Sequence, residues 1–213
     1  GAFYHTARWP EQEPDFAGKR VGVIGNGSSG TQLIPIVAQQ AEHLTVFIRT
    51  PNYYAPALNR PLTDDDYAEW ERIRDDVRRK LREGVLIGSG DVFMEEEMHK
   101  SRARSGEDYS PEERQQIMER RWNNGGAVAA RVFADVMVNE KVNGIVSDFL
   151  RGKIGDAIAD ADTADTLTPK DFAYGTKRIT IGTGYLETFN RPNVDAINVR
   201  KTPIERITPK GMV

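Results

Sequence analysis

Apolar residues follow two different patterns along the chain. Continuous apolar runs occupy residues 19–25 (KRVGVIG) and 43–50 (HLTVFIRT), as is typical of strands buried in a parallel sheet. Between these runs, residues 28–41 carry apolar side chains at the spacing of a helix, namely Leu33, Ile34, Val37 and Ala41. Strand, helix and strand within about thirty residues make a βαβ unit, so the pattern predicts an α/β fold with a Rossmann-like parallel sheet.

A helical pattern replaces the strand pattern after this unit. Residues 63–83 repeat apolar side chains at helical spacing, at Trp70, Ile73, Val77 and Leu81. Thr63 and the aspartates that follow it predict the start of this helix. Asp75 and Arg79 lie four residues apart, so we expect them to form an ion pair that supports the helix weakly.

Further helices are predicted before the strand pattern returns. Residues 110–122 have the same periodicity, with Ser110 as the cap and a proline at the first helical position. Residues 127–152 predict one or two helices, broken near the Asn-Gly pair at 143–144, and residues 155–169 predict a loop or short helix. Strand patterns follow at 177–185 and 193–200, and the chain ends on ITPKGMV, a strand–turn–strand pattern.

These patterns divide the chain into three parts. Residues 1–18 read as a loop, residues 19–56 and 171–213 form the Rossmann-like domain, and residues 57–170 form a helical insertion in it. The chain starts at Gly1 without an initiator methionine and ends within a strand pattern. We therefore expect a segment excised from a longer protein, with proteolytic processing as the alternative.

Composition narrows the classes of partner. With 38% hydrophobic and 29% charged residues the chain has a globular composition, and its net charge of −3 gives no reason to expect nucleic acid as a partner. No apolar run approaches the ~20 residues that a membrane helix needs, and no signal peptide opens the chain, so no membrane partner is expected. The absence of cysteine fits a reducing compartment, and we expect a cytoplasmic location.

Few other residues suggest catalysis by the chain itself. His5, His43 and His99 are far apart and lack metal-ligand spacing, so no metal site is predicted. No G-x-S-x-G motif is present for a hydrolase. The carboxylate runs at 64–66 and 95–97 are interpreted as solvated helix faces.

The turn between the first strand and the first helix carries a glycine motif. Gly25, Gly27 and Gly30 form G-x-G-x-x-G in the strand–turn–helix context that dinucleotide sites require. The first glycine permits the tight turn, the second lets the backbone approach a pyrophosphate, and the third lets the helix pack close to the strand. N–H groups at the helix start then face the anion, and the loop and first turn add the polar side chains of Asn26, Ser28, Ser29 and Gln32.

The end of the second strand indicates which dinucleotide binds. An acidic residue there would accept a hydrogen bond from a ribose 2′-hydroxyl, but this chain has Arg49 and Thr50. A guanidinium forms bidentate hydrogen bonds to phosphate, so the site is predicted to bind NADP(H) rather than NAD(H). The alternative is a glycine-rich turn without a ligand, with Arg49 as a solvated charge.

The first ten residues, GAFYHTARWP, contain the pattern G-x-x-x-H-x-x-x-W-P. This pattern resembles the fingerprint of Baeyer–Villiger monooxygenases, F-x-G-x-x-x-H-x-x-x-W-[P/D], whose initial Phe would lie before Gly1. FIRTPNYYAPALNRPL (47–62) and YGTKRITIGTGYLETFNRPNV (174–194) also resemble segments of that family, in the family's order. The resemblance covers about a hundred residues at both ends of the chain, while the helical middle is similar only in kind.

The resemblance implies roles for individual residues. The pyrophosphate and nearby ribose would be held by the glycine motif with its polar neighbours, namely Gly25, Asn26, Gly27, Ser28, Ser29, Gly30 and Gln32. Arg49, Thr50 and Lys177 would hold the 2′-phosphate, and Arg178 would be the active-site arginine that stabilises an anionic intermediate at the flavin. His5 and Trp9 would couple domain movement to chemistry. Without the resemblance, Lys177 and Arg178 would read as two ordinary strand charges.

The resemblance also implies the chemistry of a parent enzyme. Such an enzyme uses NADPH, FAD and O2 to convert a ketone into an ester or lactone. The chain has only one G-x-G-x-x-G motif, so FAD is expected to bind mainly outside it, in a domain of the same polypeptide, and the chain alone is not expected to oxygenate ketones. An N- or S-oxygenating flavin monooxygenase and a non-catalytic NADP-binding sensor remain the alternatives.

Overall fold

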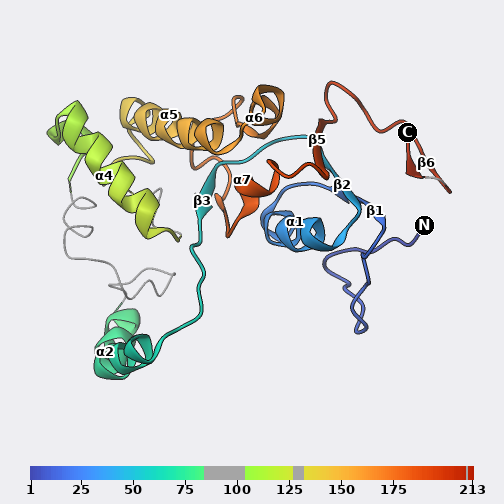
Figure 1. Cartoon of the computed structure of the whole chain (residues 1–213). Coiled ribbons are helices and arrows are strands. Elements are labelled where there is room, and N and C mark those ends of the chain that lie inside the picture. The colour runs from blue at the N-terminus through green and yellow to red at the C-terminus, as the bar shows by residue number, and fades with distance from the viewer. Residues whose placement is uncertain (84–103, 127–131, 210) are drawn as a thin grey trace. The chain divides into compact units, whose positions relative to one another are not determined.

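The computed structural model of the chain describes residues 1–83, 104–126, 132–209 and 211–213 (Figure 1). It contains two compact units. Gly1–Tyr54 together with Ser147–Val213 form the first, and Ala55–Val146 form the second. The first boundary between the units, after Tyr54, lies in the short strand at 54–56. The second boundary, after Val146, lies inside the helix at 140–157. The three-part division read from the sequence remains a prediction.

The first unit is built on a parallel sheet in the order β1-β2-β5. Its strands are β1 (Arg20–Ile24), β2 (His43–Ile48) and β5 (Val194–Asn198). The central strand buries alternate residues, with Leu44, Val46 and Ile48 each at most 1% exposed. Strand, helix and strand follow one another as predicted, which confirms the α/β class.

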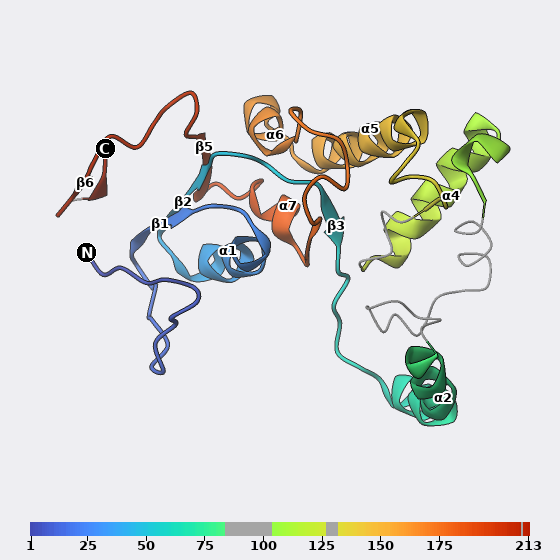
Figure 2. The ribbon, with the colours of Figure 1, turned by 180° about the vertical axis from the view of Figure 1, so that it is seen from behind.

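The helix α1 (Ser28–Gln40) connects β1 to β2 and lies against the sheet (Figures 1 and 2). Its packed face consists of Ile34, Val37 and Ala38, all at most 1% exposed. Asn193, just before β5, donates its side-chain amide to the carbonyl oxygens of Ala38 and Ala41, each at 3.0 Å. This amide satisfies carbonyls that the end of the helix leaves without partners and fixes α1 relative to β5.

The remaining elements of the first unit are short. The strand β4 (Thr180–Gly182) is shorter than the predicted strand at 177–185, and α7 (Tyr185–Thr188) begins at the last residue of that predicted strand. Of the two alternatives predicted for 155–169, a loop or a short helix, the structure has a short helix, α6 (Ala161–Leu167). Asp160 caps it by accepting a hydrogen bond from the Thr163 N–H at 2.8 Å. At the end of the chain, β6 (Ile207–Thr208) and β7 (Gly211–Met212) pair antiparallel, as the strand–turn–strand pattern predicts.

The second unit consists mainly of helices. The strand β3 (Tyr54–Pro56) leads from the first unit into it, and α2 (Asp64–Arg82) begins directly after Thr63, as predicted. The helix α4 (Pro111–Asn124) starts with the predicted Ser110 cap, in a capping box with Glu113. Among the residues that the structure describes, no helix has the length and apolar character to cross a membrane.

Two predictions for this region were wrong. Arg79 forms its ion pairs with Asp76 at 2.5 Å and Glu83 at 2.7 Å, and not with Asp75. The helix α5 (Glu140–Ala157) continues through the Asn-Gly pair at 143–144. Tertiary packing outweighs the low helix propensity of that pair, since the helix buries a stripe four residues apart at Val142, Val146, Leu150 and Ile154.

The predicted helix at 127–152 is also shorter than expected. Residues 132–139 form turns, and α5 starts after Asn139, whose side-chain oxygen accepts hydrogen bonds from the N–H groups of Lys141 and Val142. Asparagine favours this capping position because its side chain replaces the missing backbone acceptor. Residues 127–131 lie outside the described part of the chain, as do 84–103 with His99 and the carboxylate run at 95–97.

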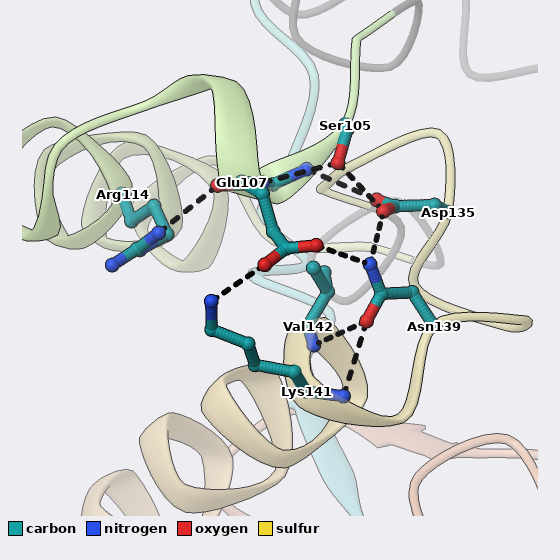
Figure 3. A network of polar contacts seen from close by, with 8 residues as sticks. Ser105, Glu107, Arg114, Asp135, Asn139, Lys141 and Val142 are labelled. Carbon is teal, nitrogen blue, oxygen red and sulfur yellow. Dashed lines mark hydrogen bonds and ion pairs between the residues drawn. The ribbon is translucent and has the colours of Figure 1, made fainter.

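A polar network joins the 3₁₀ helix η1 (Gly106–Asp108) to the start of α5 (Figure 3). The carboxylate of Asp135 accepts from the Ser105 hydroxyl at 2.7 Å, the Gly106 N–H at 3.0 Å and the Asn139 amide at 2.9 Å. Glu107 extends the network through Lys141, at 2.5 Å, and Asn139, at 3.0 Å. One carboxylate thus holds together two segments that are about thirty residues apart in the sequence.

Candidate functional site

The glycine motif lies in the turn between β1 and α1, and each glycine has a different environment. Gly25 has φ +95°, which a residue with a side chain rarely adopts, and its N–H donates to the Phe47 carbonyl oxygen at 2.8 Å. A Cβ at Gly30 would lie 2.5 Å from the carbonyl oxygen of Gly25. A Cβ at Gly27 would meet no atom within 4 Å. The first and third glycines therefore serve the fold, while the second borders open space.

The N-terminus of α1 has the features of an anion site. Gly27 is its N-cap, no side chain caps the helix, and Ser28 and Ser29 are exposed. The first N–H groups of a helix lack partners within it and carry a partial positive charge. Gln32 donates its side-chain amide to the Ser28 carbonyl oxygen at 3.2 Å and so lies over this first turn.

Asn26 differs from the rest of the loop, because it is only 7% exposed. Its carbonyl oxygen accepts from the Thr31 hydroxyl at 3.2 Å, which holds the loop to α1. The hydroxyl of buried Tyr185 lies next to the Asn26 side chain, and burial is the main cause that raises the pKa of that tyrosine. Asn26 therefore contributes to the site through the shape of the loop more than through an exposed side chain.

Arg49 and Thr50 follow β2 directly, where the sequence predicts the phosphate-binding group. Arg49 is exposed. The Thr50 hydroxyl accepts a hydrogen bond from Nη2 of Arg200 at 3.2 Å. Arg200 lies two residues after the end of β5 and was not among the predicted site residues. The signal for it was its place as the last residue of the next strand pattern, 193–200.

Lys177 lies in a bend and Arg178 in the irregular segment that follows it, both before β4 and not within a strand as predicted. Both are exposed, and Nζ of Lys177 lies 4.7 Å from the ring centre of Phe172. The side-chain amide of Asn52 donates to the Arg178 carbonyl oxygen at 2.6 Å. This bond places the chain after Thr50 beside the chain at Arg178. Asn52 is a second residue that the sequence analysis missed, because its partner is 126 positions away.

His5 and Trp9 make local contacts in the N-terminal segment. The carbonyl oxygen and Nδ1 of His5 accept from the N–H groups of Arg8 and Ala7, at 2.8 and 3.1 Å. The Trp9 ring packs beside Tyr4 and Phe16, with centroid distances of 6.0 and 6.4 Å. In the described part of the chain, no hydrogen bond or ring contact joins His5 or Trp9 to Arg178.

The candidate residues therefore fall into three groups. The glycine motif and its polar neighbours surround the N-terminus of α1, and Arg49 and Thr50 lie at the adjacent strand end. Asn52 ties Lys177 and Arg178 to that strand-end segment. His5 and Trp9 form the third group, in a segment that pairs with the far end of α1 through the bridge between Ala17 and Ala41.

Known proteins match the chain over its full length. Acetone monooxygenase (methyl acetate-forming) of Gordonia sp. (strain TY-5) is 38% identical over 100% of the chain and 38% of its own length. A Baeyer–Villiger monooxygenase of Pseudooceanicola batsensis is 37% identical over 100% of the chain and 37% of its own length. The chain thus spans less than two fifths of the curated relatives it matches. No protein-family model matches it.

Solved structures agree with these relatives. The structure of an oxidised steroid monooxygenase bound to NADP superposes with a TM-score of 0.87 and 43% identity, covering 98% of this chain and 38% of that one. At this identity the likeness extends beyond a shared fold to the sequence itself. In both sequence and fold, the chain is similar to one region of each of these monooxygenases.

Proposed function

We propose that the chain is the NADP(H)-binding region of a Baeyer–Villiger monooxygenase. One observation carries the proposal: an uncapped helix N-terminus behind a glycine turn lies beside a strand that is followed directly by Arg49 and Thr50. The helix N-terminus suits a pyrophosphate, and the guanidinium suits the 2′-phosphate that NAD(H) lacks. The match to monooxygenases, one of them bound to NADP, supports the same conclusion.

The described residues fit this cofactor. Open space beside Gly27 allows a pyrophosphate to approach the backbone. At Gly30, the Gly25 carbonyl oxygen leaves no room for a side chain. The pyrophosphate and ribose would be held by Gly25, Asn26, Gly27, Ser28, Ser29, Gly30 and Gln32. Arg49, Thr50 and Lys177 would hold the 2′-phosphate, since cations and a hydroxyl donor together match its charge and acceptors.

The proposed enzyme needs more than this region. NADPH supplies a hydride when it is bound, and FAD and O2 complete the conversion of a ketone into an ester or lactone. Within this chain, Arg178 would stabilise negative charge beside the flavin, and His5 and Trp9 would couple movement of the N-terminal segment to chemistry. The flavin-binding region would belong to the same polypeptide, and we propose a cytoplasmic location, which cell fractionation would check.

The preference for NADP(H) over NAD(H) tests this proposal. We expect calorimetry on the chain to show tighter binding of NADP⁺ than of NAD⁺. Arg49→Gln should weaken NADP⁺ binding roughly 10- to 100-fold, because it removes charge-assisted hydrogen bonds to phosphate, and should leave NAD⁺ binding unchanged. Arg20→Gln is the matched control, because Arg20 is an exposed arginine at the start of β1, the opposite end of the sheet. Equal affinity for both coenzymes would refute the proposal.

A further inference from the structure

We propose that Arg200 is a further specificity-determining residue, which binds the 2′-phosphate of NADP(H) together with Arg49. The proposal rests on the proposed function, because it assigns an additional cation to the same cofactor. The proposed function assigns the 2′-phosphate to Arg49, Thr50 and Lys177. The structure places Arg200 beside Thr50 through the register of the sheet and a hydrogen bond, and an ion pair with Asp171 orients its side chain.

The register of β2 and β5 places Arg200 at the candidate site. In this parallel pair Ile48 lies opposite Asn198, and the Val199 N–H donates to the Ile48 carbonyl oxygen at 2.9 Å. Thr50 lies two residues after Ile48, and Arg200 lies two residues after Asn198. The two residues are therefore neighbours just beyond the ends of the paired strands. The carboxyl ends of parallel strands are also where ligands bind in open α/β sheets.

A direct contact confirms this placement. Nη2 of Arg200 donates to the hydroxyl oxygen of Thr50 at 3.2 Å. Thr50 is the residue that the proposed function assigns to the 2′-phosphate. A phosphate that Thr50 reaches is therefore also within reach of a guanidinium, which carries five N–H donors and can bind phosphate bidentately.

The guanidinium is held in place without being buried. Nη1 of Arg200 forms an ion pair with the carboxylate of Asp171, and the Arg200 backbone N–H donates to the Asn198 side chain at 3.0 Å. The Arg200 side chain is still 52% exposed, so a ligand can reach it. A cation whose orientation is fixed in advance loses less conformational entropy when a ligand binds.

Asp171 also limits how much Arg200 is expected to contribute to phosphate binding. Its carboxylate neutralises part of the Arg200 charge, and the pair is exposed to solvent, with side chains 52% and 60% exposed. Exposed charges interact weakly because water screens them. We therefore expect Arg200 to contribute less to phosphate binding than Arg49, whose side chain has no such acidic partner among the described residues.

The test compares two small ligands that differ by one phosphate. We would measure the binding of 2′,5′-ADP and of 5′-ADP to the chain by calorimetry, for the wild type, Arg200→Gln, Arg200→Lys, Arg49→Gln and the control Arg20→Gln. Arg200→Gln should weaken 2′,5′-ADP binding about three- to fivefold and change 5′-ADP binding less than about twofold. Arg200→Lys should recover part of the loss, because it keeps the charge but not the bidentate geometry of the guanidinium. Circular dichroism would verify that each variant is folded.

The outcomes separate this inference from the proposed function. If Arg49→Gln selectively weakens 2′,5′-ADP binding but Arg200→Gln does not, the inference about Arg200 is wrong and the proposed function stands. If Arg200→Gln weakens both ligands equally, Arg200 has a structural role and the inference is also overturned. If the wild type does not distinguish the two ligands, the proposed function itself fails.

Discussion

At the scale of single residues, the glycines of the motif differ in why glycine is needed: one position is restricted by the fold, and another borders open space. Gly30 is needed by the fold, because a methyl group there would lie 2.5 Å from a backbone oxygen. Gly27 borders open space, and its φ of −69° is accessible to any residue. In the proposed function, the approach of the pyrophosphate to the backbone is the reason for glycine at that position.

This difference predicts opposite effects of two alanine substitutions. Gly30→Ala should lower the free energy of unfolding by about 1–3 kcal/mol, because the helix must move away from the strand end. Gly27→Ala should leave that free energy nearly unchanged but weaken NADP⁺ binding at least about tenfold, because the methyl group occupies the approach to the backbone. Thermal unfolding and calorimetry would measure the two quantities. A Gly27→Ala variant that binds NADP⁺ normally would contradict the predicted role of the second glycine.

The site residues that could be predicted from the sequence have partners nearby in the sequence, and those that could not have partners far away in it. The glycine motif and Arg49 are readable because βαβ geometry fixes them within one local unit. Asn52 and Arg200 escape such a reading, because their partners are 126 and 150 positions away. The strand predicted at 177–185 includes Lys177, but the strand β4 begins only at Thr180.

At the scale of elements, the start of α5 depends on one carboxylate. Asp135 accepts hydrogen bonds from Ser105, Gly106 and Asn139, and Asn139 in turn caps the helix. Burial opposes the charged form of Asp135, but these hydrogen bonds outweigh it and lower the pKa of the carboxyl group below its ordinary value. The Asn-Gly pair at 143–144 predicted a break in this helix. The Asn139 cap was not predicted, because Glu107 and Ser105, which hold the network around it, lie about thirty positions earlier in the sequence.

The lowered pKa of Asp135 predicts a dependence of stability on pH. Because the folded state has the lower pKa, the stabilisation is complete above the unfolded pKa of about 4 and is lost as the pH falls from there toward the folded value. Asp135→Asn should cost about 1–3 kcal/mol at pH 7 and should flatten the decline in unfolding free energy below about pH 4.

Urea unfolding between pH 7 and pH 3 would measure this effect, with amide hydrogen exchange to localise it to η1 and α5. Asp75→Asn is the control, since the Asp75 side chain is 87% exposed and lies 3.9 Å from its nearest arginines. An Asp135→Asn variant with the wild-type pH profile would show that the network does not set the stability of this region.

At the scale of the whole molecule, the chain contains only part of what the proposed chemistry requires. The relatives extend well beyond the region that it matches, and a single glycine motif serves one dinucleotide. The alternatives from the sequence, an N- or S-oxygenating enzyme and a sensor without redox activity, differ from the proposal in their products. An experiment that distinguishes these alternatives therefore needs a protein that carries this region together with a flavin-binding region.

Substitution of Arg178 distinguishes these alternatives. In such a protein, Arg178→Ala should abolish ester or lactone formation from a cyclic ketone and leave NADPH affinity within about twofold, because Arg178 is assigned to the flavin side rather than to the phosphate. Product analysis and NADPH titration would measure both quantities. Retention of oxygenation would remove the catalytic assignment, and loss of NADPH affinity would move Arg178 into the cofactor site.

The pairing of β2 with β5 has a consequence for how the protein is made. The glycine turn, α1 and β2 are contiguous, so they can assemble while most of the chain is still being synthesised, whereas Thr50 meets Arg200 only across a separation of 150 residues. Contacts of such long range close late and slowly, because the intervening chain must first lose its entropy. A nascent chain would therefore acquire the glycine turn and Arg49 before Arg200 adds its smaller proposed contribution to the discrimination between the two nicotinamide coenzymes.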